Sequence, residues 1–142
     1  MARLSLTDIR VRQLVARLVP VTVELGSVNR VCDVLNEALA KEGINLDVVD
    51  LRTVRPIDVE AIAKSVQKTN RAVVLEEGWE ICGMGAQVVD FIQRECFDDL
   101  DAPVIRVHQA DVPMPYAKNL ERAAKPDAAK AIAAVKKVLY LE

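Results

Sequence analysis

The chain has 142 residues, of which 51% are hydrophobic and 28% are charged, and its formal net charge is −2. A chain of this length is expected to form one domain with room for one proper core. The small net charge argues against a general nucleic-acid binder, and an aromatic content of 4% leaves few rings for base stacking. No apolar run approaches the roughly 18–20 residues that a membrane span needs.

Residues 1–20 differ from the rest of the chain. They hold four arginines against one aspartate, a net charge of +3, which leaves −5 for the remainder. Apolar residues recur near one helical face, and Pro20 ends the segment, so the pattern predicts a basic amphipathic helix. A mitochondrial transit peptide would have a similar composition. A helix packed on the domain or on a partner is the favoured alternative, because almost no linker precedes the first strand.

From residue 21 onward, strand and helix patterns alternate with short connections. This order indicates βαβ units, a mostly parallel sheet and helices on both faces. Gly43 is placed to end the first helix, and Asp58 or a neighbour to begin the second. The predicted strands cover residues 21–25, 46–51, 72–75 and 103–107, and a fifth strand is not readable. The predicted helices cover residues 28–39, 58–66, 88–97, 118–123 and 127–139.

The three cysteines are Cys32, Cys82 and Cys96, and none of them forms a CxxC pair. An odd number without a signal peptide predicts free thiols in a reducing compartment.

Six short segments occur in one order and together are far more specific than any one of them. They are 51–58 (Leu-Arg-Thr-Val-Arg-Pro-Ile-Asp), 66–69 (Val-Gln-Lys-Thr), 75–79 (Leu-Glu-Glu-Gly-Trp), 83–86 (Gly-Met-Gly-Ala), 97–103 (Phe-Asp-Asp-Leu-Asp-Ala-Pro) and 111–116 (Asp-Val-Pro-Met-Pro-Tyr). With them, the chain from about residue 21 to its end resembles the C-terminal domain of the β subunit of thiamine-diphosphate-dependent 2-oxoacid dehydrogenases, above all pyruvate dehydrogenase E1. It also resembles the C-terminal domain of transketolase.

The resemblance implies a three-layer α/β/α domain over residues 21–142, with a mostly parallel five-stranded sheet. It implies an assembly and docking role, in which the domain helps to build an α2β2 heterotetramer and contacts the subunit-binding domain of the E2 acyltransferase. Thiamine diphosphate, magnesium and the catalytic histidines belong elsewhere in that enzyme. We therefore expect no catalytic, cofactor-binding or metal-binding residue here, and no catalysis by this chain alone. The expected partners are an E1 α-like subunit, E2 and a second copy, and the expected compartment is the cytoplasm or the mitochondrial matrix.

Four residues are candidates for partner binding. The resemblance implies that Asp101 meets basic side chains of E2 and that the C-terminal carboxylate joins it. Trp79, the only tryptophan, is a candidate interface anchor if it is exposed. Met114 and Tyr116 lie in a loop whose two prolines fix an extended path, which suits either a preordered contact surface or a cover over the chain's own domain.

Three motifs leave a catalytic or binding alternative open. His108 is the only histidine and follows a strand, where open α/β sheets place ligand sites, although a loop histidine is favoured. Glu76 and Glu77 would suit an acid and a base if their pKa values were split, but a structural or interface role is favoured. Gly83 and Gly85 precede a helix and would suit a phosphate, yet close packing of the helix explains them as well.

The likeness covers less than half the length of the family's β chain, and residues 1–20 do not resemble the family's linker. A subcloned domain, a fusion and a natural truncated paralogue all fit this arrangement, and Leu141 and Glu142 would suit a cloning remnant. Two further functions also remain open. One is a subunit of an active thiamine-diphosphate enzyme, completed by a separate N-terminal chain. The other is a structural subunit anchored in a larger complex by residues 1–20.

Overall fold

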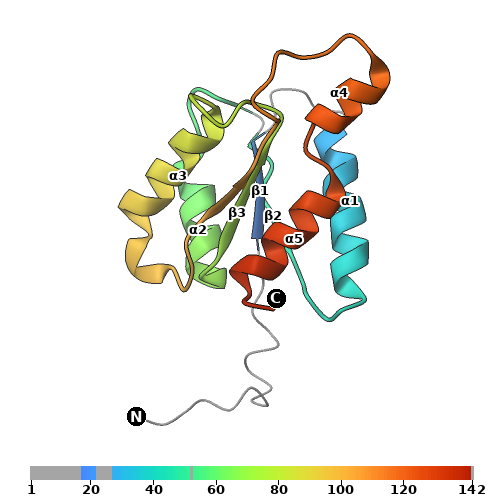
Figure 1. Ribbon diagram of the computed structural model, residues 1–142. Helices are drawn as coiled ribbons and strands as arrows, with labels where there is room; N and C mark the ends of the chain where they lie inside the picture. The colour runs from blue at the N-terminus through green and yellow to red at the C-terminus, as the bar shows by residue number, and fades with distance from the viewer. Residues whose placement is uncertain (1–16, 22–26, 52, 142) are drawn as a thin grey trace.

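The computed structural model describes residues 17–21, 27–51 and 53–141, with side chains from Val34 onward. A parallel sheet in the order β2-β1-β3-β4 lies between two helical layers. Figure 1 shows α2 and α3 on one face and α1 and α5 on the other, which confirms the three-layer α/β/α fold. In chain order the elements are β1 (Arg17–Val21), α1 (Ser27–Ala40), β2 (Asp47–Val48), α2 (Val59–Thr69), β3 (Ala72–Glu76), α3 (Met84–Glu95), the 3-10 turn η2 (Phe97–Asp99), β4 (Ile105–Val107), α4 (Lys118–Ala124) and α5 (Ala128–Val138).

The central strand β3 divides the core into two clusters. All five of its residues are buried, and alternate side chains point to opposite faces of a strand. Val73 and Leu75 pack with side chains of α1 and α5, whereas Ala72 and Val74 pack with those of α2 and α3. This continuous apolar strand, covered on both sides, is typical of a parallel sheet.

The helix ends follow the sequence signals closely. Asp58 caps α2 by accepting a hydrogen bond from the Ala61 N–H at 2.9 Å, and Asp127 caps α5 in the same way from Lys130. Gly43 has a φ of +77°, a left-handed conformation that glycine adopts without strain after a helix. Both predicted starts and the predicted glycine stop are therefore confirmed.

The start of the domain differs from the prediction. Residues 17–20 were assigned to the end of a helix, yet they belong to β1, which pairs with β3 along its whole length. Strand pairing depends on neighbours that are distant in the chain, and here it overrides the local helical pattern. Only Arg17 and Leu18 of β1 pair with β2. Pro20 lies beyond this pairing, so its missing N–H is tolerated on that side of the strand. The remaining parts of the predicted helix and first strand, residues 1–16 and 22–26, lie outside the described residues.

The described residues form four strands. The resemblance implies a fifth, which stays a prediction because residues 1–16 and 22–26 lie outside the described part of the chain. One further prediction needs correction. Phe97 was assigned to the apolar face of a helix, but α3 ends at Glu95 and Phe97 begins the exposed turn η2. Helical spacing continued past the real end of the helix because η2 has a similar periodicity over its short length.

The core beneath α3 generates a stability prediction. Replacing Ile92, which is fully buried, with alanine removes packed methyl groups and should lower the free energy of unfolding by about 2–5 kcal/mol. Leu120→Ala, at an exposed leucine of α4, should change it by less than about 0.5 kcal/mol. Urea denaturation followed by circular dichroism measures both, and equal losses would contradict the assigned core.

Candidate functional site

A buried carboxylate joins three elements at the end of the central strand. Glu76 ends β3, and its side chain is 3% exposed. Its Oε2 accepts a hydrogen bond from the Gly85 N–H at 2.8 Å, and its Oε1 accepts one from Arg106 Nη2 at 2.5 Å. A buried carboxylate is tolerated when it is paired and hydrogen-bonded, and the positive end of a helix dipole favours it further. Glu76 therefore connects β3 to β4 and to the first turn of α3.

The glycines near α3 make room for this carboxylate. A Cβ atom added to Gly78, Gly83 or Gly85 would collide with the side-chain oxygens of Glu76. The N–H of Gly85, at the start of α3, already binds Glu76, so the protein's own carboxylate occupies this part of the helix N-terminus. This close packing accounts for the glycines and supports their structural interpretation.

Arg106 also fixes the loop after β3. Its Nη1 donates to the carbonyl of Glu80 at 2.8 Å, and its Nη2 lies 3.4 Å from the carbonyl of Trp79. Glu77 points to a different partner and forms an ion pair of 3.7 Å with Lys125 at the end of α4. The two adjacent glutamates thus serve separate ion pairs, which supports their structural interpretation.

The loop after β4 is tied to the loop after β3. Gln109 is buried, its N–H donates to the carbonyl of Gly78 at 3.0 Å, and its side-chain amide donates to the carbonyl of Val112 at 3.3 Å. The N–H of Ala110 donates to the carbonyl of Ala124 at the end of α4. These bonds hold the two loops and α4 together at the carboxyl edge of the sheet, at the top of Figure 1.

Large apolar side chains are exposed on these two loops. Half of the Trp79 surface is accessible, and Tyr116 is fully exposed. We call this set the carboxyl-edge surface. It contains Trp79, Ile81, Val112, Met114 and Tyr116. Exposed apolar residues on loops that are internally hydrogen-bonded are typical of an interaction surface.

His108 lies beside this surface in a partly buried position. Its Nδ1 is 2.9 Å from the carbonyl oxygen of Gln109, and its Nε2 is 3.8 Å from a carboxylate oxygen of Glu80. A backbone carbonyl and a surface carboxylate are ordinary neighbours of a loop histidine.

Asp101 lies at the opposite, amino edge of the sheet. Its N–H donates to the carbonyl of Asn70 at 2.8 Å, and the Asn70 side chain donates to the carbonyl of Asp99 at 2.7 Å. Asn70 ends α2 in a left-handed conformation with φ of +62°, which asparagine tolerates better than most residues. The end of α2 therefore fixes the backbone of the acidic loop, while the Asp101 side chain remains 54% exposed.

Arg71 connects Asp101 to the end of the chain. Its side chain is 8% exposed, and Nη2 lies 3.8 Å from Asp101 Oδ2. Its Nη1 donates to the carbonyl of Val138, and its guanidinium lies over the Tyr140 ring, 5.3 Å from the centroid. We call Arg71, Asp101 and Tyr140 the amino-edge surface. The terminal carboxylate that the resemblance adds to this site lies outside the described residues, which end at Leu141.

The four predicted partner-binding residues thus divide between two ends of the sheet. Trp79, Met114 and Tyr116 lie on the carboxyl-edge surface, and Asp101 lies on the amino-edge surface. The sequence reasoning missed the two arginines that organise these surfaces, Arg71 and Arg106. A signal was present, because Arg106 interrupts an apolar strand and Glu76 ends another, and buried opposite charges on adjacent strands are expected to pair.

Two of the three cysteines have described side chains. Cys82 and Cys96 are both free, as predicted. Cys96 is buried, but Cys82 is exposed, whereas free thiols were expected to be buried or half-buried. Burial raises the pKa of the Cys96 thiol. Among residues 34–51 and 53–141, whose side chains the structure describes, no three or more histidine, cysteine or acidic side chains gather into a possible metal site. None of the described helices has the length and hydropathy that a membrane span requires.

The chain is similar to known proteins in both sequence and fold. Residues 21–131 match the family model for the transketolase C-terminal domain. The chain is 50% identical over 104 residues to a pyruvate dehydrogenase E1 component subunit beta from Rickettsia bellii, which covers 73% of this chain and 32% of the relative. It is 51% identical over 102 residues to the mitochondrial subunit of the same name from Dictyostelium discoideum, covering 72% of this chain and 29% of the relative.

The fold also matches a solved structure. A split-gene transketolase, described as an inactive beta4 tetramer, superposes with a TM-score of 0.73 at 28% identity. That match covers 91% of this chain and 39% of the other. The chain therefore spans about a third of the length of the curated relatives that it matches.

The buried ion pair generates a prediction. Arg106→Met leaves the Glu76 carboxylate buried without its charged partner and should destabilise the domain by about 3–5 kcal/mol. Arg94→Met breaks a surface pair with Asp90 and should cost less than about 1 kcal/mol. Adding Glu76→Gln to Arg106→Met removes the buried charge and should recover part of the loss. Denaturant unfolding measures all three variants, and an equal effect of the two arginine changes would contradict the structural role of Glu76.

Proposed function

The chain belongs to the transketolase C-terminal domain family, and we propose that it is a non-catalytic assembly and docking domain of a pyruvate dehydrogenase E1 β-like subunit. The proposed docking function is supported mainly by the amino-edge surface, where the exposed carboxylate of Asp101 lies next to the buried Arg71. The proposed assembly function is supported by the carboxyl-edge surface. The proposed partners are an E1 α-like subunit, the subunit-binding domain of E2 and a second copy of the chain.

The amino-edge surface suits a cationic partner. The Asp101 backbone is fixed by Asn70, so docking would not have to order it. Half of its side chain is open to a lysine or arginine, and such charge-assisted contacts set both register and association rate. Arg71 also holds the C-terminal turn beside Asp101, which supports a site shared by both segments.

The carboxyl-edge surface suits a subunit contact. Tryptophan, tyrosine and methionine are enriched in the centres of protein interfaces, and this surface has one of each. Both loops are already held by backbone hydrogen bonds, which lowers the entropy cost of association. Glu77 is paired with Lys125, whereas Glu80 and Asp111 are exposed beside the apolar side chains.

A second candidate is a subunit of an active thiamine-diphosphate enzyme that is completed by a separate N-terminal chain. The structural relative described as a split-gene transketolase favours it. Under this alternative the carboxyl-edge surface would contact the completing chain. Activity towards a 2-oxoacid by the purified chain alone would contradict both candidates, and activity that appears only on mixing with such a chain would select the second.

Docking on E2 is tested at Asp101. Asp101→Lys reverses the charge that would meet basic side chains and should weaken binding of the cognate E2 subunit-binding domain by about 1–3 kcal/mol. Asp98→Lys makes the same change at an exposed position in the same loop and should have a much smaller effect. Isothermal titration calorimetry with the full chain gives both affinities. Unchanged binding by the Asp101 variant would remove this residue from the site.

Subunit association is tested at Trp79. Trp79→Ala should weaken assembly with an E1 α-like subunit by about 2 kcal/mol or more, because buried aromatic anchors dominate such interfaces. Val34→Ala, at an exposed position of α1, is the matched control and should leave assembly unchanged. Sedimentation velocity over a concentration series measures the association. Equal assembly by the Trp79 variant and the parent chain would place the contact elsewhere.

A further inference from the structure

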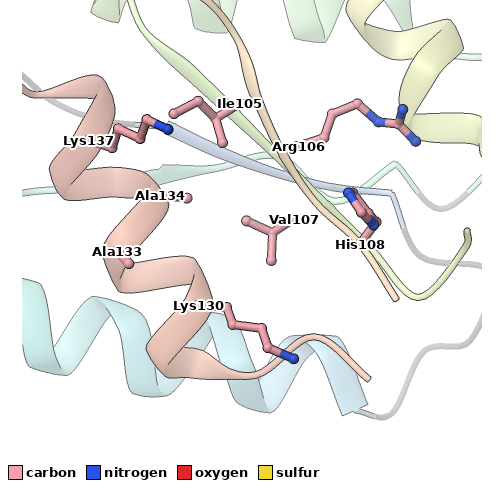
Figure 2. Close-up of a pocket in the computed structure, with 8 residues that line it drawn as sticks. All are labelled: Ile105, Arg106, Val107, His108, Lys130, Ala133, Ala134 and Lys137. Carbon is pink, nitrogen blue, oxygen red and sulfur yellow. The ribbon is translucent and has the colours of Figure 1, made fainter. Parts of the chain in front are cut away.

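An open groove of about 390 Å³ lies between the edge strand β4 and helix α5. Figure 2 shows Val107 pointing towards α5, with Lys137 near the Ile105 end of the strand and Lys130 near the His108 end. Small side chains on α5 keep the groove open. Its strand side is formed by Ile105 and Val107, its helix side by Ala133 and Ala134, and its ends by Lys130 and Lys137.

The strand side of this groove is an edge of the sheet. β4 pairs with β3 through residues Ile105 to Val107, and no strand in the described part of the chain pairs with its other side. An edge strand presents backbone N–H and C=O groups that another extended segment can bind. Apolar side chains next to such an edge would add a contact for one apolar residue of that segment.

The charge of the groove is positive. Lys130 and Lys137 are both exposed and are seven residues apart, which puts them on one side of α5 with a separation of about 10.5 Å along the axis. No carboxylate lines the groove. Arg106 points to the other side of the sheet, where it pairs with Glu76, so the two lysines dominate the local charge (Figure 2).

We propose that this groove binds an extended acidic segment of a partner protein, which adds to β4 as a further strand. The segment would carry acidic residues at positions 1 and 5 and an apolar residue at position 3. Those side chains share one face of a strand, and the outer two are about 13 Å apart, within reach of two flexible lysines about 10.5 Å apart. The apolar residue would contact Val107 and Ala134.

Other occupants fit less well. The first sixteen residues of this chain hold three arginines and one aspartate, so their charge does not complement two lysines. A second copy could offer its other edge strand, β2, but that strand has two residues, and its Asp47 is paired with Lys68. The acidic partner segment has the matching charge.

This inference does not depend on the proposed docking at Asp101. The amino-edge surface presents a carboxylate and would take a cationic partner, whereas the groove presents lysines and would take an anionic one. Changes at Lys130 and Lys137 should therefore leave partner binding at Asp101 unchanged. Asp101→Lys should likewise leave peptide binding in the groove unchanged. Failure of one proposal can be recognised while the other holds.

The experiment uses the full chain and two synthetic pentapeptides. The first has glutamate at positions 1 and 5, valine at position 3 and threonine between them, and the control has lysine in place of glutamate. Titration is followed by amide chemical shifts in two-dimensional NMR. The glutamate peptide should change the amide chemical shifts of β4 and of the side of α5 that faces it. Salt at about 0.5 M should lower the affinity for this peptide, because exposed charges are screened.

Charge reversal provides the matched variants. The double variant Lys130→Glu and Lys137→Glu should lower the affinity for the glutamate peptide by about tenfold. It should bind the lysine peptide more tightly than the glutamate peptide. Lys118→Glu, at an exposed lysine outside the groove, should change neither affinity much. Thermal melting checks that each variant is folded. Equal binding of both peptides, shifts confined to other surfaces, or a concentration-dependent self-association that accounts for the β4 shifts would overturn the proposal.

Discussion

The ion pair between Glu76 and Arg106 is the interaction on which the rest of this domain depends. It places a carboxylate under the first turn of α3, and this requires glycine at the three positions that surround it. The same arginine binds two carbonyls of the loop after β3, so the position of Trp79 follows from it. A buried charged pair contributes less to net stability than its Coulomb attraction suggests, yet it strongly penalises arrangements in which one partner is left alone. Its main effect here is to fix where the sheet, the helix and the loop meet.

The two ends of the sheet are organised by similar means for different contacts. At the carboxyl edge, Arg106 and Gln109 hold two loops whose exposed side chains are mainly apolar. At the amino edge, Arg71 and Asn70 hold an acidic loop and the C-terminal turn, leaving Asp101 accessible. In each case a buried polar side chain satisfies backbone groups that a loop would otherwise leave unpaired. Surfaces fixed in this way can bind a partner with little further ordering.

The motifs that left a chemical alternative open have structural partners in the fold. Gly83 and Gly85 suit a phosphate by local pattern, but a side chain nine residues away from Gly85 fills that position. Glu76 and Glu77 are adjacent in the chain and suit an acid-base pair, but successive side chains of a strand diverge to different partners. Asp101 and Trp79 were both predicted to bind partners, and they lie at opposite edges of the sheet because Asp101 precedes β4 whereas Trp79 follows β3. In each case the missing information was a contact between residues distant in sequence.

The sequence by itself determined the fold class, most helix positions and their caps, because periodicity and the preferences of aspartate, asparagine and glycine at helix ends are local properties. It also determined the family, through six motifs in one order. Only the tertiary structure decided that residues 17–20 form a strand, since strand pairing depends on distant neighbours. It alone revealed the pairing of Glu76 with Arg106 and the position of Arg71 between Asp101 and Tyr140. Charged residues within apolar strands mark Glu76 and Arg106 as candidates for pairing, but the pairs themselves depend on which segments become neighbours in the fold.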